Sequence, residues 1–100
     1  MSISAYNLRV KGQVQGVGFR PFVYNLAARL GVCGFVKNGP QGVVIHAQAE
    51  TALLTQFKQR LLDEQPSMSL IETIDMTPAQ VVPTLTDFSI KTSETGALDL

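Results

Sequence analysis

The chain has 100 residues, of which 45% are apolar and 16% are charged, and its eight basic and eight acidic side chains give a formal net charge of zero. This is the size and composition of one folded globular domain, not of a disordered segment. One cysteine and one histidine exclude a disulfide framework and a metal site built on Cys and His ligands, and no apolar run approaches the ~20 residues that span a bilayer. We therefore expect a reducing, cytoplasmic setting.

Charge is unevenly distributed along the chain. Every charged residue before Ala49 is basic, and the acidic residues begin at Glu50. This distribution favours an anionic ligand for the first half of the chain. The cations are too dispersed for a typical nucleic-acid interface, which clusters Lys and Arg and has a basic overall balance. We expect a small anion as partner, with no nucleic acid and no membrane.

The first predicted element is a strand over residues 3–14, where apolar and polar residues alternate. After the stretch QVQGVGFRPF at Gln13–Phe22, apolar residues recur every three or four positions and predict an amphipathic helix over Pro21–Leu30. Proline suits the first helical position because it has no N–H to leave unpaired there, and Gly31 is typical of a residue that closes a helix.

The middle of the chain predicts a hairpin followed by a helix. Two β-prone runs, Gly34–Lys37 and Val43–Ala49, flank the turn sequence NGPQG. A second amphipathic pattern predicts a helix over Thr51–Asp63, with Thr51 as its N-cap.

The last third predicts two further strands. Leu70–Met76 alternates as a strand, a loop contains Pro78 and Pro83, and Phe88–Lys91 is a short final strand. Residues 93–100 are polar and small and are interpreted as a linker or tail, which leaves 1–92 as the folded domain.

The predicted order, βαββαβ, is the split βαβ pattern of a ferredoxin-like fold. The fold class is therefore α+β, an α/β sandwich with an antiparallel four- to five-stranded sheet and two helices on one face.

The segment Gln15–Arg20 places two glycines between a strand and a helix. The first N–H groups of a helix are unpaired and carry partial positive charge, and successive loop amides can surround an anion, so this arrangement suits a phosphate or carboxylate. Arg20 would add a charged, two-pronged donor. From spacing alone, an ordinary tight turn with a solvated Arg20 remains an alternative.

Three further polar or reactive residues have structural explanations. Asn38 precedes a glycine-containing turn, where asparagine commonly bonds to its own backbone. His46 has no partner from a catalytic motif nearby and is interpreted as a surface residue of its strand. Cys33, beside the helix-closing region, is interpreted as a small packing residue.

Two motifs together, GQVQGVGFR at Gly12–Arg20 and GFVKNGPQGVV at Gly34–Val44, resemble the paired signature of acylphosphatases in their order and separation. In that family the amides of the glycine loop and the arginine bind phosphate, and the asparagine orients the attacking water. The resemblance therefore implies Arg20 and Asn38 as catalytic residues, no metal, and a phosphate cradle formed by Gln15, Gly16, Val17, Gly18, Phe19 and Arg20.

The stretch RPFVYNLAARLG at Arg20–Gly31 resembles, more narrowly, the N-terminal domain of the HypF family of hydrogenase maturation carbamoyltransferases, and the tail SETGALDL is in keeping with this. That resemblance implies carbamoyl phosphate as substrate and inorganic phosphate as product. It also implies HypE and the other HypF domains as partners. ATP and zinc would serve only downstream domains, so no cofactor is expected in this one, which should be monomeric when isolated.

Acyl and carbamoyl phosphates have weakly basic leaving groups, so hydrolysis needs no general acid, only positioning and electrostatic stabilisation. The leading hypothesis is an acylphosphatase-type hydrolase domain acting on carbamoyl phosphate. A stand-alone acylphosphatase and a phosphate-binding docking module with little turnover remain alternatives. RNA-recognition domains share the element order, but the aromatic-rich sheet pattern that they use for base stacking is missing from this sequence.

Overall fold

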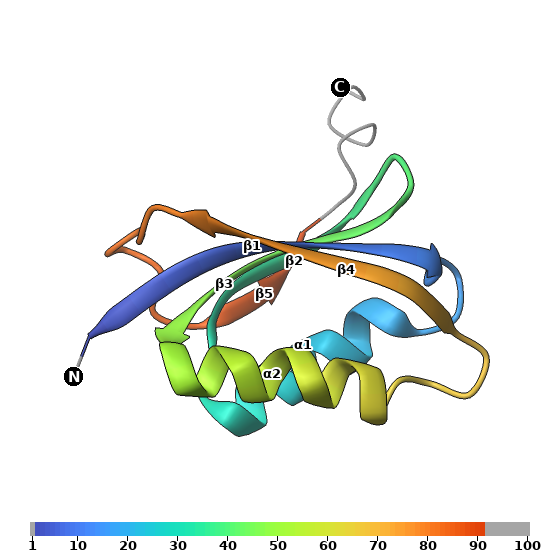
Figure 1. Ribbon diagram of the computed structural model, residues 1–100, viewed down its shortest axis with the longest axis horizontal. Coiled ribbons are helices and arrows are strands. Elements are labelled where there is room, and N and C mark those ends of the chain that lie inside the picture. Colours follow the sequence, from blue (N-terminus) through green and yellow to red (C-terminus); the bar gives the residue numbers. More distant parts are fainter. Residues whose placement is uncertain (1, 92–100) are drawn as a thin grey trace.

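The computed structural model describes residues 2–91. Its elements, in chain order, are β1 (Ile3–Gln13), α1 (Phe19–Leu30), β2 (Cys33–Gly39), β3 (Gly42–Glu50), α2 (Thr51–Asp63), β4 (Leu70–Ala79) and β5 (Phe88–Ile90). The strands form one sheet in the order β4-β1-β3-β2-β5, and both helices cover the same face of it (Figure 1). The predicted ferredoxin-like α/β sandwich is confirmed. The predicted tail, residues 93–100, lies outside the described residues.

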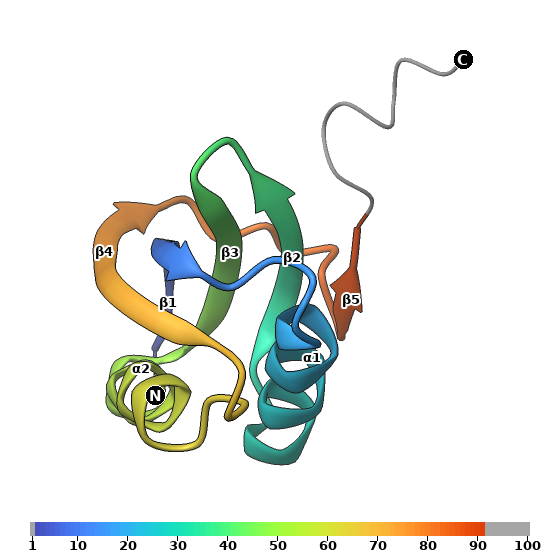
Figure 2. The ribbon, with the colours of Figure 1, turned by 90° about the vertical axis from the view of Figure 1, so that its right-hand side faces the viewer.

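The sheet is mixed, whereas the sequence predicted only antiparallel pairing. β1 pairs antiparallel with β3 and β4, and β2 pairs antiparallel with β3. β5 instead lies parallel to β2 at the far edge, as Figure 2 shows. The chain therefore crosses from one edge of the sheet to the other between β4 and β5.

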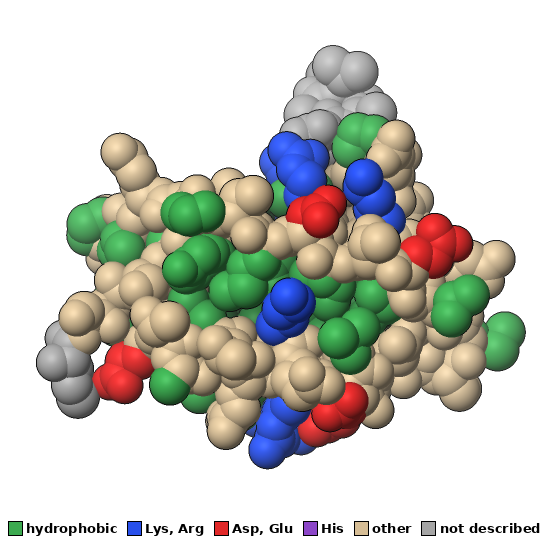
Figure 3. Space-filling view, viewed as in Figure 1, with side chains coloured by type: hydrophobic (Ala, Val, Ile, Leu, Met, Phe, Trp, Pro, Cys, Tyr) green, Lys and Arg blue, Asp and Glu red, His purple; other side chains and the backbone are tan. Residues whose placement is uncertain are grey.

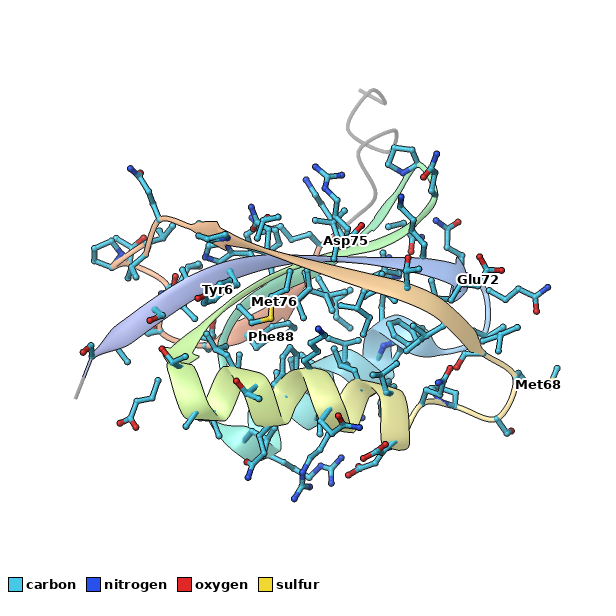
Figure 4. All side chains as sticks on the ribbon, in the orientation of Figure 1. Tyr6, Met68, Glu72, Asp75, Met76 and Phe88 are labelled. Atoms are coloured by element: carbon cyan, nitrogen blue, oxygen red, sulfur yellow. The ribbon has the colours of Figure 1, made fainter. Side chains whose placement is uncertain are left out.

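The core lies between the sheet and the helices. Side chains alternate across the sheet, so in Figure 4 Met76 lies between β4 and the helices while its neighbour Asp75 lies on the other face. In Figure 3 apolar side chains reach the surface in the middle of the view, between the sheet and α2. The largest fully buried side chains come from both layers: Phe19, Phe57, Leu8, Leu26, Ile45, Leu54 and Leu61.

Helix α1 begins earlier than predicted. It starts at Phe19, with Gly18 as N-cap in the left-handed conformation (φ 77°, ψ 19°). The hydrogen bond that opens the helix runs from the Phe22 N–H to the Gly18 carbonyl oxygen, at 3.2 Å. Pro21 is therefore not the first helical residue but lies within the first turn, where a missing N–H still costs no hydrogen bond.

Helix α2 has the predicted span but a different cap. Its N-cap is Glu50, in extended conformation and without a side-chain cap, so the prediction of Thr51 as N-cap was wrong. β3 runs directly into the helix, which makes Thr51 its first residue. The Thr51 hydroxyl lies 3.0 Å from the Ser4 hydroxyl instead.

Strand β4 continues through Pro78, which was predicted to lie in a loop. β4 is an edge strand, paired only with β1. Proline is tolerated in edge strands because its missing N–H can face away from the partner strand. The sequence alone does not predict that β4 continues through Pro78, because it does not show which strand lies at the edge of the sheet.

His46 is buried, with 6% of its surface exposed, so its interpretation as a surface residue was wrong. Its ring stacks on Phe35 at 5.4 Å between centroids, and its Nε2 lies 3.0 Å from Gln48 Oε1. Gln48 in turn exchanges two hydrogen bonds with the backbone of Val82. The segment between β4 and β5 therefore covers this part of the sheet face.

The ring of Phe57, on α2, is fully buried and lies 6.5 Å from the ring of Phe88 on β5. Phe57→Ala should lower the free energy of unfolding by about 3–5 kcal/mol, through lost burial and the cavity that remains. Urea denaturation would measure the loss. Tyr24→Ala, at a side chain that is 41% exposed on α1, is the control and should change stability by less than about 1 kcal/mol. Similar losses in both variants would contradict this account of the core.

Candidate active site

The loop between β1 and α1, residues 14–18, is shaped by two glycines. Gly16 and Gly18 have φ values of 73° and 77°, in the left-handed region that residues with a side chain rarely adopt. A Cβ atom at either position would have no neighbour within 4 Å. The backbone conformation, and not a shortage of space, therefore requires glycine here.

This loop exposes unpaired donors at the start of a helix. Within the described residues, no hydrogen bond engages the backbone N–H groups of Gly16, Val17, Gly18, Phe19 and Arg20. The N-terminus of α1 adds the partial positive charge of the helix dipole. Donors and charge together make the loop a site for an anion.

Arg20 is the second residue of α1 and is half-buried. Among residues 2–91 it forms no ion pair or hydrogen bond, and the first turn of α1 contains no acidic residue. A guanidinium group without a carboxylate partner keeps its donors available for a ligand.

Asn38 lies near the end of β2, opposite Val43 of β3 and on the face that the helices cover. Its Oδ1 is buried and has no hydrogen-bond partner, the one such side-chain atom in the part of the chain that the structure describes. The side chain therefore does not form the local backbone bond of an ordinary turn asparagine. An unpaired buried polar atom costs about 1–3 kcal/mol, and a catalytic role is one explanation for keeping it.

Gln15 connects the loop to the β2–β3 hairpin. Its Nε2 donates hydrogen bonds to the carbonyl oxygens of Gly39, at 2.9 Å, and Gly42, at 2.7 Å. These two residues form the last pair of the hairpin, and Gly39 directly follows Asn38. The loop and the hairpin consequently lie together at one end of the sheet, as Figures 1 and 2 show.

The structure brings the predicted site residues together, and it places Cys33 and His46, which were interpreted as structural, elsewhere. Gln15–Arg20 and Asn38 are brought to the same end of the sheet, on two segments joined by hydrogen bonds. Cys33 starts β2, at the opposite end from Asn38, and His46 lies on the face away from the helices.

No group of His, Cys, Asp and Glu side chains among residues 2–91 is suited to hold a metal ion. Neither helix there is long and apolar enough to cross a membrane.

Sequence reasoning gave no role to Gly42, which fixes the hairpin against β1. A Cβ atom at this position would lie 2.0 Å from the carbonyl oxygen of Val10. The close approach of two backbones therefore requires glycine. In the sequence, the second glycine of NGPQG marks this position, but the preference of turns for glycine already accounts for it.

Comparisons with known proteins match both the sequence and the fold. The sequence model of the acylphosphatase family matches residues 6–90. Carbamoyltransferase HypF2 of Cupriavidus necator is 48% identical over 67 residues, which are 67% of this chain and 8% of that protein. A crystal structure of full-length HypF in the phosphate- and nucleotide-bound form has a TM-score of 0.85 and 33% identity, over 93% of this chain and 12% of that one. The crystal structure of acylphosphatase from Bacillus subtilis has a TM-score of 0.80 and 32% identity, over 90% and 99% of the two chains.

The chain belongs to the acylphosphatase family, and it is a hydrolase domain of the acylphosphatase type. It is homologous both to the acylphosphatase-like domain of HypF carbamoyltransferases and to stand-alone acylphosphatases. It spans 8–12% of the length of the HypF relatives.

The left-handed glycines give a test of the loop. Gly18→Ala and Gly31→Ala each place a side chain at nearly the same φ, 77° and 79°, with no neighbour within 4 Å. Both should lose about 1–2 kcal/mol of stability from backbone strain. Only Gly18→Ala should weaken the binding of inorganic phosphate, measured by calorimetry, because only Gly18 lies at the N-terminal end of α1. Equal phosphate affinities in the two variants would contradict the assignment of the loop as the anion site.

Proposed function

We propose that this domain hydrolyses carbamoyl phosphate as the acylphosphatase-like domain of a HypF-type carbamoyltransferase. The observation that carries the proposal is that two sets of polar groups without hydrogen-bond partners lie at the same end of the sheet. These are the N–H donors of residues 16–20 and the Oδ1 of Asn38. The first group suits a phosphoryl group, and the second suits a water molecule beside it. Both are held at one end of the sheet by the bonds of Gln15.

In the proposed reaction the loop and Arg20 bind the phosphoryl group. The N–H donors surround its oxygens, and the guanidinium group adds a paired, charged contact. As water approaches phosphorus, negative charge spreads over the phosphoryl oxygens, and donors already in position stabilise it without rearrangement. This stabilisation is strongest in the transition state, so it raises the rate and not only the affinity.

Asn38 is proposed to orient the attacking water. Its Oδ1 is buried in the free protein, and once a small movement of the side chain exposes it, it can accept a hydrogen bond from the water, which turns an oxygen lone pair toward phosphorus. A water bound in this way also satisfies an atom that otherwise has no partner. The bond between phosphorus and the acyl or carbamoyl oxygen then breaks, giving phosphate and a carboxylate or carbamate. Because that leaving group is weakly basic, no general acid has to protonate it.

The choice of carbamoyl phosphate is supported by the similarity to HypF carbamoyltransferases, in which this domain forms a small part of a longer chain. In that setting we infer contacts with the other HypF domains and with HypE, and a cytoplasmic location. No cofactor is required for the hydrolysis itself, and ATP and zinc would serve downstream domains.

Two other functions are compatible with the same site. A stand-alone acylphosphatase is favoured by the match to the Bacillus subtilis enzyme, which covers 99% of that chain. A docking module would bind the phosphate compound with little turnover. Phosphate release from carbamoyl phosphate and from benzoyl phosphate distinguishes the three functions. Similar turnover of both compounds indicates a general acylphosphatase, and a preference for carbamoyl phosphate supports the HypF proposal. Binding without turnover indicates a docking module.

Arg20→Ala should lower kcat/KM for an acyl phosphate by about 10²–10³-fold, because the charged donor to the phosphoryl oxygens is removed. Arg20→Lys should recover only part of the loss, since an ammonium group cannot donate in the paired geometry. Phosphate-release kinetics measure both. Arg29→Ala is the matched control on the same helix, because Arg29 pairs with Glu64 at 3.4 Å on an exposed surface, and its activity should be unchanged. An Arg20→Ala variant with full activity would overturn the assignment.

Asn38→Ala should separate turnover from binding. We expect kcat to fall by about 10²-fold, as for removal of a group that orients a reactant, while the dissociation constant for inorganic phosphate changes less than about threefold. Stability should not fall by more than about 1 kcal/mol, because the removed oxygen is buried without a partner. Single-turnover kinetics, calorimetry and thermal unfolding measure the three quantities. Losses of similar size in turnover and in phosphate binding would count against a role in placing water.

A further inference from the structure

We propose that Gln15 is a positioning residue, which acts on the reaction through Asn38 and does not use its side chain to bind phosphate. The proposal rests on the proposed function, in which Asn38 orients the attacking water. It assigns Gln15 a different task from its neighbours in the loop. Their backbone N–H groups are free, whereas the side-chain amide of Gln15 is already engaged with the hairpin.

The hydrogen bonds of Gln15 leave no side-chain donor for a ligand. An amide nitrogen has two hydrogens, and those of Gln15 Nε2 are directed to the carbonyl oxygens of Gly39 and Gly42. Carbonyl oxygens only accept, so the nitrogen of the amide, and not its oxygen, must face them. The remaining oxygen, Oε1, is an acceptor and would repel the oxygens of a phosphoryl group. The side chain therefore joins two segments of protein.

The two hydrogen bonds of Gln15 hold the hairpin at residues close to Asn38. Gly39 is the following residue in the chain, and Gly39 and Gly42 form the last pair of the hairpin. The end of the β2–β3 hairpin projects past the body of the sheet (Figure 1). A link from the loop to both carbonyl oxygens fixes the end of β2 relative to the loop, and with it the direction of the Asn38 side chain.

Asn38 needs such a support because its position is unfavourable in itself. A buried oxygen without a partner favours any movement that exposes it to water. Small displacements of the hairpin would allow this by turning the oxygen toward bulk water and away from the loop, where the proposed attacking water would lie. The 2.7 Å and 2.9 Å bonds from Gln15 oppose that displacement. Gln15 thus links the group that orients water to the loop that holds phosphate.

Gln15→Met tests the proposal, because methionine has a similar length and no donor. We expect kcat to fall by about 10- to 100-fold, the range associated with misplacing a reacting group by about 1 Å, while phosphate affinity changes less than about threefold. The effect should nearly vanish in an Asn38→Ala background, where Gln15→Met should change kcat less than about twofold. Gln13→Met, at an exposed glutamine that ends β1, is the control and should retain full activity.

The outcomes distinguish this proposal from simpler ones. If Gln15 bound phosphate directly, Gln15→Met would weaken phosphate affinity as strongly as turnover, and the loss would persist without Asn38. If it only stabilised the fold, the unfolding temperature would fall while kcat below that temperature stayed unchanged. Either result would overturn the proposal. If Gln15→Met does not fold, Gln15→Asn, which keeps the donors but shortens the reach, should show the same selective loss of kcat.

A measurement independent of activity keeps this inference separate from the proposed function. In nitrogen-15 NMR spectra, the side-chain amide of Asn38 should shift and broaden in Gln15→Met and not in Gln13→Met. If the wild-type domain hydrolyses no acyl phosphate, the proposed function fails, and the spectra still show whether Gln15 positions Asn38. Unchanged Asn38 resonances in Gln15→Met would overturn the inference, whether or not the domain is active.

Discussion

The site depends on how residues 14–18 end a strand and start a helix within one short turn. Phe19, the first residue of α1, is 1% exposed, and its ring packs 5.6 Å from that of Phe22. The core therefore fixes where the helix begins. Gly16 and Gly18 supply the left-handed turns that allow β1 to reach that point. Because the core fixes the start of the helix, it also fixes the backbone positions of the loop N–H groups and of Arg20 in the first turn.

The core residues stabilise the domain, and the site residues do not. The loop leaves N–H groups unpaired, Arg20 has no partner among residues 2–91, and Asn38 Oδ1 is buried without a hydrogen bond. The buried Oδ1 is unfavourable in the free protein, whereas the exposed loop N–H groups and the half-buried Arg20 are hydrated there. The buried side chains of both helices and of the central strands offset the cost of the Oδ1. Binding of an anion then gains from loop donors that need no rearrangement.

The sequence was sufficient for features that depend on local pattern. Alternation and helical spacing predicted every element, and the paired motifs brought Arg20 and Asn38 into one hypothesis. Two errors are local, at the start of α1 and at the N-cap of α2. The others lie where the answer depends on distant segments. Pro78 can continue β4 because the strand ends at an edge, and His46 is buried because the segment around Val82 crosses its face. The bonds of Gln15 join residues 24 and 27 positions apart, which no local periodicity reports.

The same geometry also bears on why such a domain would form part of a larger chain. The match to Bacillus subtilis acylphosphatase covers 99% of that enzyme, so the fold described here corresponds to nearly the whole of that protein. Hydrolysis of a carbamoyl phosphate, however, releases carbamate, which decomposes in water. A carbamoyltransferase can use that product only if the next site receives it quickly, and covalent linkage raises the effective concentration between two sites. The proposed substrate, unlike a simple acyl phosphate, therefore gives a chemical reason for this domain to be joined to others.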